Sequence, residues 1–442
     1  MLRIWKVRGG GHAYYLEVAG SPERPGPEPD ARWIGRGSES WGLSGPVGGD
    51  QLGRALAGTD PRTGAELSAS RSRVTVAGFD LTFCAPKSVS LLHALGEPDV
   101  SDAVGTGHRR AVEAAVEYLD QRAVAVRRRT EGVGRLPVPG LGAPAAAFVH
   151  RTSRGLDPHL HTHVVLANVA RDRAGDWSAL DGRGIYAHAS AAGALYQAQL
   201  RHELTTNLGV QWSGLRGGRA DIEGIGPEAR AEFSRRSQAI RAHLVERGLV
   251  DEAAGTPEAA AAGAGSGRAR AIAAAVTRPA RVADLDPESL RPWWQGRARA
   301  VGLGPRRLET VLDRVPQRGR HGAGSQVASV EDVAAAVCSA RGSDSPFSRR
   351  HAVRAWASVQ PAGAPAAVIG RDVERLMAVS EPCDSIRASH DGPGVAEVRR
   401  ALPERLRRQE IDLLLAKRGM QRTGALELGH AREPMDRGMG LG

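Results

Sequence analysis

The sequence predicts an α+β fold, because two different hydrophobic periods occur in one chain. Phe79, Leu81 and Phe83 alternate with polar residues, which is the two-residue period of a half-buried strand. The segment from about 102 to 127 instead places alanines, valines and a leucine at helical spacing. The first half of the chain holds segments of both kinds, and the second half is expected to be largely helical.

The first half of the chain gives the clearest element boundaries. Residues 20–72 are rich in glycine, proline and charge, so most of that segment is expected to be loop. Pro86 ends the strand before it, and Ser88 can cap the helix that follows. The expected elements are a strand, a glycine turn and a helix start within 1–18, a helix at 50–57, a strand at 79–83, helices at 88–95 and about 102–127, strands at 145–150 and 160–169, and a helix at 188–208.

The second half of the chain gives weaker signals. Residues 253–275 are rich in alanine and glycine and are expected to be a flexible or marginal segment. None of the chain's lysines lies in a phosphate-cradling glycine loop, so no nucleotide-binding motif is expected. Helices are expected at 227–248, 287–302, 307–314, 330–340, 348–358, 370–379 and 395–418.

The balance of charge favours a polyanionic partner. The 442 residues carry a formal net charge of +11, almost all of the positive charge coming from arginine. Such an excess attracts phosphate, although basic proteins that bind no nucleic acid are common. The three cysteines lie far apart, which fits a reducing compartment and no disulfide framework. With no long apolar run and no apolar signal core at the N-terminus, the composition predicts a cytoplasmic protein without a membrane span.

Histidines gather at two neighbouring strands of the predicted sheet. His161 and His163 are two residues apart in a strand, so their side chains share one face. His150 ends the preceding strand and reaches the same face if the two strands pair antiparallel. Three neutral imidazoles can hold one divalent ion and leave positions open for substrate. The alternative is a set of ordinary histidines without a ligand, and His159, after a proline at the strand start, is interpreted as a bystander.

Two further features supply acid–base and nucleophilic groups. Asp80 lies on the polar face of an apolar strand, where a carboxylate can orient a metal-bound histidine or accept a proton. Tyr14 and Tyr15 are adjacent behind the glycine turn. A phenol can form a covalent phosphotyrosine link, and its pKa of ~10 requires a nearby base or cation. The alternatives are a solvent-facing aspartate and two amphipathic residues at the edge of a core.

Four other residues can bind phosphate. A helix start offers charge and free backbone N–H groups, and arginines beside the histidine cluster offer guanidinium groups. For each of these residues the alternative is an ordinary solvated surface position. The candidates are Lys87, Ser88, Arg151 and Arg154.

Together these pieces resemble the relaxase domain of conjugative plasmid proteins, the TrwC/TraI-like or MobF class of the HUH endonucleases. The resemblance covers residues 1–310 with decreasing clarity. Four stretches carry it: Ala13-Tyr14-Tyr15, the run Gly-Phe-Asp-Leu-Thr-Phe-Cys-Ala-Pro-Lys-Ser-Val-Ser at 78–90, the run His-Arg-Thr-Ser-Arg-Gly-Leu-Asp-Pro-His-Leu-His-Thr-His at 150–163, and Trp-Ser-Ala-Leu-Asp-Gly-Arg at 177–183.

The resemblance implies a central antiparallel sheet flanked by helices, with the site on the sheet face. It implies an enzyme that nicks one DNA strand at a transfer origin and stays attached to the 5′ phosphate through tyrosine. Tyr14 would be the nucleophile, Asp80 the acidic partner, and His150, His161 and His163 the ligands of a divalent metal. Magnesium or manganese is favoured by the family, and the softness of imidazole also allows zinc.

The same resemblance divides the chain into a catalytic core at 1–215, a helical DNA-clasping part at 216–315 and a junction-like tail at 316–442. Family members often carry a second tyrosine pair, but residues 16–30 contain no tyrosine, which leaves Tyr15 as the candidate for a second strand transfer. The family usually continues into a helicase, so a separate helicase and a coupling protein are expected partners. The alternatives are a rolling-circle replication initiator, a catalytically impaired DNA-binding remnant, and a metallohydrolase acting on small molecules.

Overall fold

The computed structural model describes most of the region from the N-terminus to residue 380. Within it, no helix is long and apolar enough to cross a membrane. Expectations for the glycine turn at 9–11, for Tyr14 and for helices at 330–340 and 395–418 lie outside the described residues. The described residues are 2–8, 15, 20–21, 24–25, 31–67, 75–130, 134–250, 266–279, 287–312 and 348–380.

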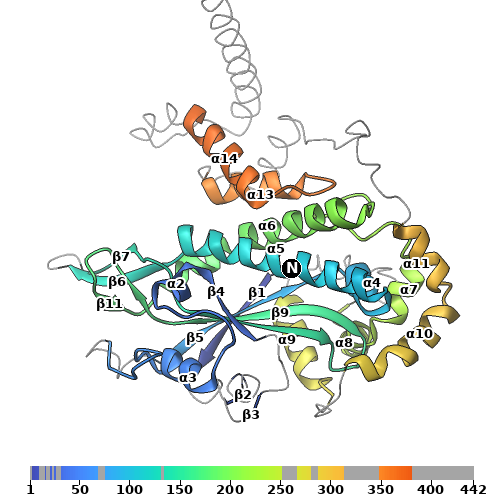
Figure 1. The fold of residues 1–442 in the computed structure, drawn as a ribbon, viewed down its shortest axis with the longest axis horizontal. Helices are drawn as coiled ribbons and strands as arrows, with labels where there is room; N and C mark the ends of the chain where they lie inside the picture. The colour runs from blue at the N-terminus through green and yellow to red at the C-terminus, as the bar shows by residue number, and fades with distance from the viewer. Residues whose placement is uncertain are drawn as a thin grey trace, which may run out of the picture.

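A five-stranded antiparallel sheet forms the centre of the molecule (Figure 1). Its strand order is β1-β5-β9-β8-β4, so β9 is central, β5 and β8 lie on either side of it, and β1 and β4 are the edges. Each strand expected from the sequence is part of this sheet, which confirms the predicted α+β class. The strands are β1 (Leu2–Arg8), β4 (Arg32–Ile34), β5 (Val76–Cys84), β8 (Ala145–Thr152) and β9 (Pro158–Ala167).

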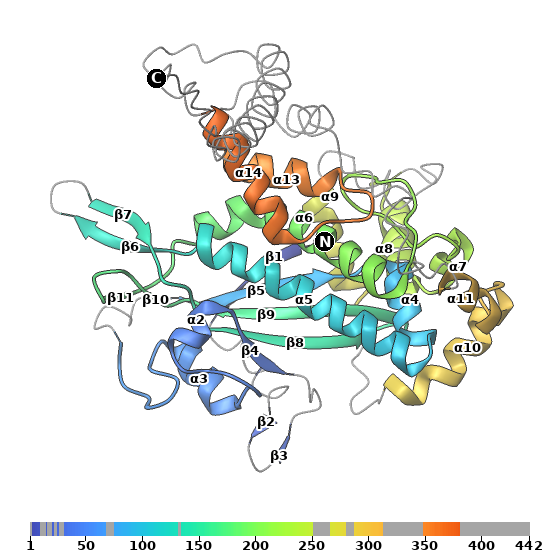
Figure 2. The ribbon, with the colours of Figure 1, turned by 45° about the horizontal axis from the view of Figure 1, so that its top comes forward.

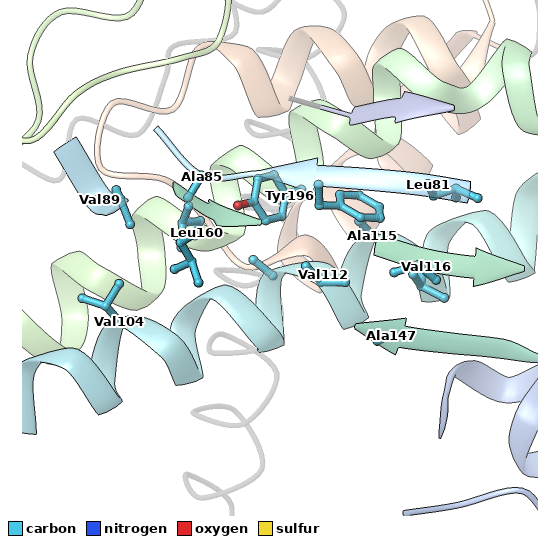
Figure 3. Close-up of a cluster of buried hydrophobic side chains, with 14 of the residues drawn as sticks. Leu81, Ala85, Val89, Val104, Val112, Ala115, Val116, Ala147, Leu160 and Tyr196 are labelled. Carbon is cyan, nitrogen blue, oxygen red and sulfur yellow. The ribbon is translucent and has the colours of Figure 1, made fainter. Parts of the chain in front are cut away.

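Three helices cover one face of the sheet (Figures 1 and 2). They are α4 (Lys87–Leu95), α5 (Pro98–Arg122) and α6 (Gly182–Leu208). Figure 3 shows Leu81 and Leu160 from the sheet meeting Val112 from α5 and Tyr196 from α6 in one buried cluster. Each such side chain contributes roughly 1.5–3 kcal/mol on burial, so this layer holds the sheet rigid.

A smaller cluster covers part of the opposite face. Trp33 from β4, Phe148 from β8 and Val165 from β9 pack there with Leu52 from α3 (Gly49–Ala57). The short helix α2 (Gly35–Ser40) follows β4 directly. Asp80 and Thr82 of β5, His150 of β8, and His161 and His163 of β9 lie on this same face by strand alternation. One face of the sheet therefore serves the main core, and the other is available for a site.

The structure corrects three expectations about local structure. The helix expected to reach about 127 ends at Arg122, because residues 125–130 pair with a second strand as a hairpin. The segment 20–72, expected to be mostly loop, also contains β4 and α2, because Ile34 packs into the main core and Trp33 packs into the smaller cluster. Within the alanine-rich segment expected to be flexible, α9 (Ser266–Val276) forms, as the high helix propensity of alanine allows.

The remaining elements surround this centre. Three two-stranded ribbons are β2 (Gly20–Ser21) with β3 (Arg24–Pro25), β6 (Ala125–Thr130) with β7 (Gly134–Pro139), and β10 (Ala170–Arg171) with β11 (Trp177–Ser178). The other helices are α7 (Pro227–Glu232), α8 (Arg235–Glu246), the 3₁₀ helix η3 (Pro287–Leu290), α10 (Arg291–Ala300), α11 (Pro305–Leu312), α13 (Arg349–Ser358) and α14 (Ala366–Ser380). Helices α13 and α14 pack on the outer side of α6 (Figures 1 and 2).

Candidate active site

The three histidines expected to bind a metal lie together on the face of the sheet opposite the main helical core. In the antiparallel pairing of β8 with β9, His150 stands directly opposite His161, and Phe148 stands opposite His163. The alternation of β9 puts His161 and His163 on the same side. One ring nitrogen from each histidine lies within 4.8 Å of the other two. This spacing fits three ligands around a single ion.

Hydrogen bonds at the far side of two rings set their tautomers. The Nδ1–H of His163 donates to both carboxylate oxygens of Asp80, each at 2.9 Å. The Nδ1–H of His161 donates to the carbonyl oxygen of His159 at 2.8 Å. Because these acceptors cannot donate, each Nδ1 carries the proton and each Nε2 keeps its lone pair. This is the arrangement in which a carboxylate or carbonyl orients a metal-binding imidazole.

The local electrostatics keep His161 neutral near pH 7. Burial, together with the charge of the neighbouring His163, lowers its pKa from 6.5 to about 4. A neutral imidazole can act as a ligand, whereas an imidazolium cannot. Three imidazole nitrogens suit a divalent ion of borderline softness, so the residues present fit a metal site.

Asp80 connects the histidines to a tyrosine. Its side chain is buried, and besides His163 it accepts a hydrogen bond from the hydroxyl of Tyr15 at 2.6 Å. The Tyr15 ring also lies near the ring of His163, with 6.3 Å between centroids. Thr82, on the same face of β5, contacts both Asp80 and His163. A phenol, a carboxylate and an imidazole thus form one hydrogen-bonded chain.

Lys87 and Ser88, expected to bind phosphate, both have protein partners at the start of α4. The Lys87 ammonium donates to the carbonyl of Pro158 at 2.6 Å, and burial lowers its pKa to about 8. Ser88 is fully buried, and its N–H and hydroxyl both donate to the Asp221 carboxylate. That carboxylate occupies the helix N-terminus, which is where a phosphate was expected.

Arg151 and Arg154 lie on the exposed side of the β8–β9 connection. Both side chains are exposed. Arg151 continues β8 beyond His150, and Arg154 lies in the turn that leads to β9. By strand alternation Arg151 turns toward the helical side of the sheet, where its charge acts on His93 of α4, whereas Lys87 and Ser88 have partners inside the protein.

The turn before β9 also carries a buried carboxylate that sequence reasoning did not single out. Asp157 is 1% exposed and accepts hydrogen bonds from the Arg235 backbone and side chain and from Arg297. Trp294 donates to the carbonyl of Leu156 at 2.8 Å. Helices α8 and α10 are thereby attached to the turn that leads into the histidine strand. The signal available in the sequence was the Asp-Pro pair directly before the histidines.

His108 is a second residue that the sequence did not indicate. It is fully buried in α5 and bridges the hydroxyls of Tyr196, at 2.9 Å, and Thr162, at 2.8 Å. Thr162 lies between His161 and His163 but faces the helices. A single histidine within a helix gives no local sign of such a partner.

Comparison with known proteins agrees with this geometry. The model of the TrwC relaxase family matches residues 6–301, which is more than half of the chain. The multifunctional conjugation protein TraI of Escherichia coli is 38% identical over 223 residues, a match that covers 48% of this chain and 12% of that protein. TraI of Escherichia coli strain K12 is 36% identical over 261 residues, covering 54% and 14% respectively. The chain thus matches a small part of the length of these relatives.

Two solved structures of the conjugative relaxase TrwC have the same fold. A metal-free complex of TrwC with oriT DNA is 30% identical with a TM-score of 0.57, covering 69% of this chain and 99% of the TrwC chain. A copper-bound complex of TrwC with oriT DNA is 29% identical with a TM-score of 0.58, covering 68% and 99%. The family resemblance inferred from the motifs is therefore confirmed.

Proposed function

The chain belongs to the TrwC relaxase family, and from this we propose that it nicks one strand of DNA at a transfer origin of a plasmid or integrative element. The proposal is supported by relatives named for conjugation and by solved relatives bound to oriT DNA. The observation that carries it is the chain from the Tyr15 hydroxyl through Asp80 to His163, beside the nitrogens of His150 and His161. This arrangement combines a phenol, a base and a divalent metal site.

In the proposed reaction, Tyr14 is the first nucleophile. Its phenolic oxygen attacks the scissile phosphorus, the bond from phosphorus to the 3′ oxygen breaks, and the 5′ phosphate remains on the tyrosine. The phenolic proton passes to a base, and Asp80 is the carboxylate that already accepts a tyrosine hydroxyl. The reverse step, attack by a 3′ hydroxyl on the phosphotyrosine, rejoins a strand. Tyr15 is proposed for a second transfer, because its hydroxyl donates a hydrogen bond to the Asp80 carboxylate.

His150, His161 and His163 are proposed as the metal ligands. When bound, a divalent ion neutralises charge on the phosphoryl oxygens. Asp80 holds His163 in the ligating tautomer, and the carbonyl of His159 does the same for His161. We propose magnesium or manganese as the working metal, with zinc as the alternative that imidazole ligands also favour.

The remaining assignments extend the same proposal. Residues 1–215 would be the catalytic core, 216–315 the part that closes over single-stranded DNA and 316–442 a junction-like tail. Arg151, Arg154, Lys87 and Ser88 are proposed as phosphate contacts, the first two with exposed side chains and the last two with bonds to Pro158 and Asp221. The expected partners are a helicase, which unwinds the nicked strand, and a coupling protein. A DNA substrate of this kind implies a cytoplasmic location.

The decisive experiment looks for the covalent adduct. The protein is incubated with single-stranded oligonucleotides that tile its own element, with manganese and with chelator, and denatured samples are examined for a protein–DNA band. We expect one oligonucleotide to form an adduct that chelator prevents, Tyr14→Phe to abolish it, and DNA binding to survive.

Other outcomes would redirect or overturn the proposal. An adduct that persists in Tyr14→Phe and disappears in Tyr15→Phe would move the first nucleophile by one residue. An adduct that forms only at a replication origin would indicate a rolling-circle initiator. Salt-sensitive binding without an adduct at any metal concentration would leave a DNA-binding remnant and exclude the nickase.

A further inference from the structure

The edge strand β1 presents two exposed side chains on the same face as the site. Leu2 and Ile4 pack against the main core on the helical side. Alternation therefore turns Arg3, Trp5 and Val7 to the opposite face, and Val7 is indeed buried in the cluster there. Trp5 nevertheless remains 55% exposed, and Arg3 is exposed as well. A large aromatic ring on a site face is left uncovered.

The register of β1 puts these two residues beside the catalytic groups. Trp5 stands directly opposite Asp80, and Arg3 stands opposite Thr82. Directly opposed residues of antiparallel strands have Cβ atoms ~4.5–5.5 Å apart. The Trp5 indole therefore borders the carboxylate that accepts the Tyr15 hydroxyl. A nucleotide whose phosphate is attacked at this site would have a neighbouring base within reach of that ring.

The surroundings of other tryptophans make the exposure of Trp5 distinctive. Trp33, Trp41 and Trp294 are buried. The ring of Trp293 is partly exposed but carries the guanidinium groups of Arg235 and Arg297. Within the described ranges, no aromatic ring or guanidinium group stacks on Trp5. Among the described residues, its ring faces therefore carry no stacked group and could receive a flat partner.

Resting on the proposed nicking function, we propose that Trp5 and Arg3 form a nucleotide subsite on β1, in which Trp5 stacks on a base next to the scissile phosphate and Arg3 binds a backbone phosphate beside it. Stacking on an aromatic ring tolerates every base, because each base has a π face. A guanidinium group matches the geometry of a phosphate. Trp5 and Arg3 are thus positioning residues that place the strand for attack.

The test measures DNA affinity by fluorescence anisotropy with the whole chain, using the oligonucleotide that forms the adduct, or the tightest binder if none does. A set of copies carries one abasic position each, for two nucleotides on both sides of the nick. We expect Trp5→Ala to weaken binding of the intact oligonucleotide about 5- to 150-fold, and Trp5→Phe to retain most of the affinity. At one abasic position, wild type and Trp5→Ala should bind equally, because the base that Trp5 contacts is missing.

Two further variants sharpen the result. Arg3→Gln should lower the slope of log affinity against log salt by about 0.7, the value for one phosphate contact on a single strand. Tyr186→Leu removes an exposed aromatic ring from α6, on the helical side of the sheet, and should leave the affinity unchanged.

The outcomes separate this subsite from the nicking proposal. The subsite is overturned if Trp5→Ala binds as wild type does, or if its loss is the same at every abasic position. If wild type forms no adduct, but Trp5→Ala loses DNA affinity on every oligonucleotide except the one with a particular abasic position, the subsite is supported and the nicking proposal fails. If wild type forms the adduct and Trp5→Ala binds DNA as tightly as wild type, the nicking proposal is supported and the subsite is overturned.

Discussion

At the scale of single residues, Asp80 organises the site. One buried carboxylate accepts hydrogen bonds from the Tyr15 hydroxyl and from the Nδ1–H of His163. Such a group fixes the ring orientation of a ligand and raises its basicity. Its burial is offset by these bonds, since an unpaired buried carboxylate would be costly. The side chain thus links the proposed proton transfer to the proposed metal site.

Asp80→Asn tests this link directly. An amide at this position loses the negative charge that holds the His163 tautomer, so we expect manganese affinity to fall about 10- to 100-fold. Isothermal titration calorimetry measures the affinity, and adduct formation should decrease with it. Asp50→Asn, at an exposed position in α3, is the matched control and should behave as wild type. Unchanged manganese affinity in Asp80→Asn would show that the carboxylate does not support the metal ligands.

At the scale of elements, the buried histidine His108 connects two helices to the sheet. His108 in α5 joins Tyr196 in α6 to Thr162 in β9. Burial lowers the pKa of His108 from 6.5 to about 3, and burial likewise lowers the pKa of His93 in α4 to about 4. Both groups are neutral in the folded protein well below the pH at which they bind protons in the unfolded chain.

These shifts predict a loss of stability in acid. Below pH 6.5 the unfolded chain takes up protons that folded His93 and His108 do not, so stability falls by about 1.4 kcal/mol per pH unit for each residue. The loss from His108 continues to about pH 3. Asp120 acts in the opposite direction below about pH 6, because burial raises its folded pKa.

Thermal melting of wild type and His108→Asn at pH 7.5 and pH 5 checks the sign. We expect Tm to fall less between the two pH values in the variant, even though the variant is less stable at both. An equal fall in both proteins would show that His108 is not a source of the acid sensitivity.

At the scale of the whole molecule, helices beyond the family match form part of the packed structure. Ala352, Val353 and Ile369 from α13 and α14 pack against Leu195 and other residues of α6 (Figure 2). Arg201 of α6 adds hydrogen bonds to this packing. It is 1% exposed and donates to the carbonyl oxygens of Gly218, Ala357 and Gln360. Burial lowers the pKa of Arg201 to about 10, so it remains charged at neutral pH and these carbonyls satisfy it.

Gly363 gives a point mutation that tests this docking. Its φ is +79°, and a Cβ there would collide with the carbonyl of Ala198 and the N–H of His202 in α6. We therefore expect Gly363→Ala to lower Tm by several degrees and to increase protease cleavage near α13. Gly370→Ala, in α14 with open space around its Cα, is the matched control and should not lower Tm. Equal Tm values for wild type and Gly363→Ala would contradict an integral role for α13 and α14.

The sequence predicted the parts of the site that depend on local geometry. A strand has a period of two, so His161 and His163 had to share a face wherever that strand lay. The helices α4 and α6 and the main strands also followed from local patterns. The edge strand β4 and the hairpin β6–β7 did not follow from local patterns. Their segments are short, polar or proline-containing, and they become strands only through pairing with a partner strand.

Contacts between distant residues, in contrast, depend on register and packing. The pairing of β8 with β9 brings His150 opposite His161, and the pairing of β1 with β5 puts Trp5 opposite Asp80. The hydroxyl of Tyr15 reaches Asp80 although 65 positions separate them in the chain. A shift of one residue in either pairing would turn these side chains to the other face. The sequence alone thus identified the residue types that the proposed reaction needs. Their assembly into one site was decided by the register of the strands and by the packing of the sheet against its helices.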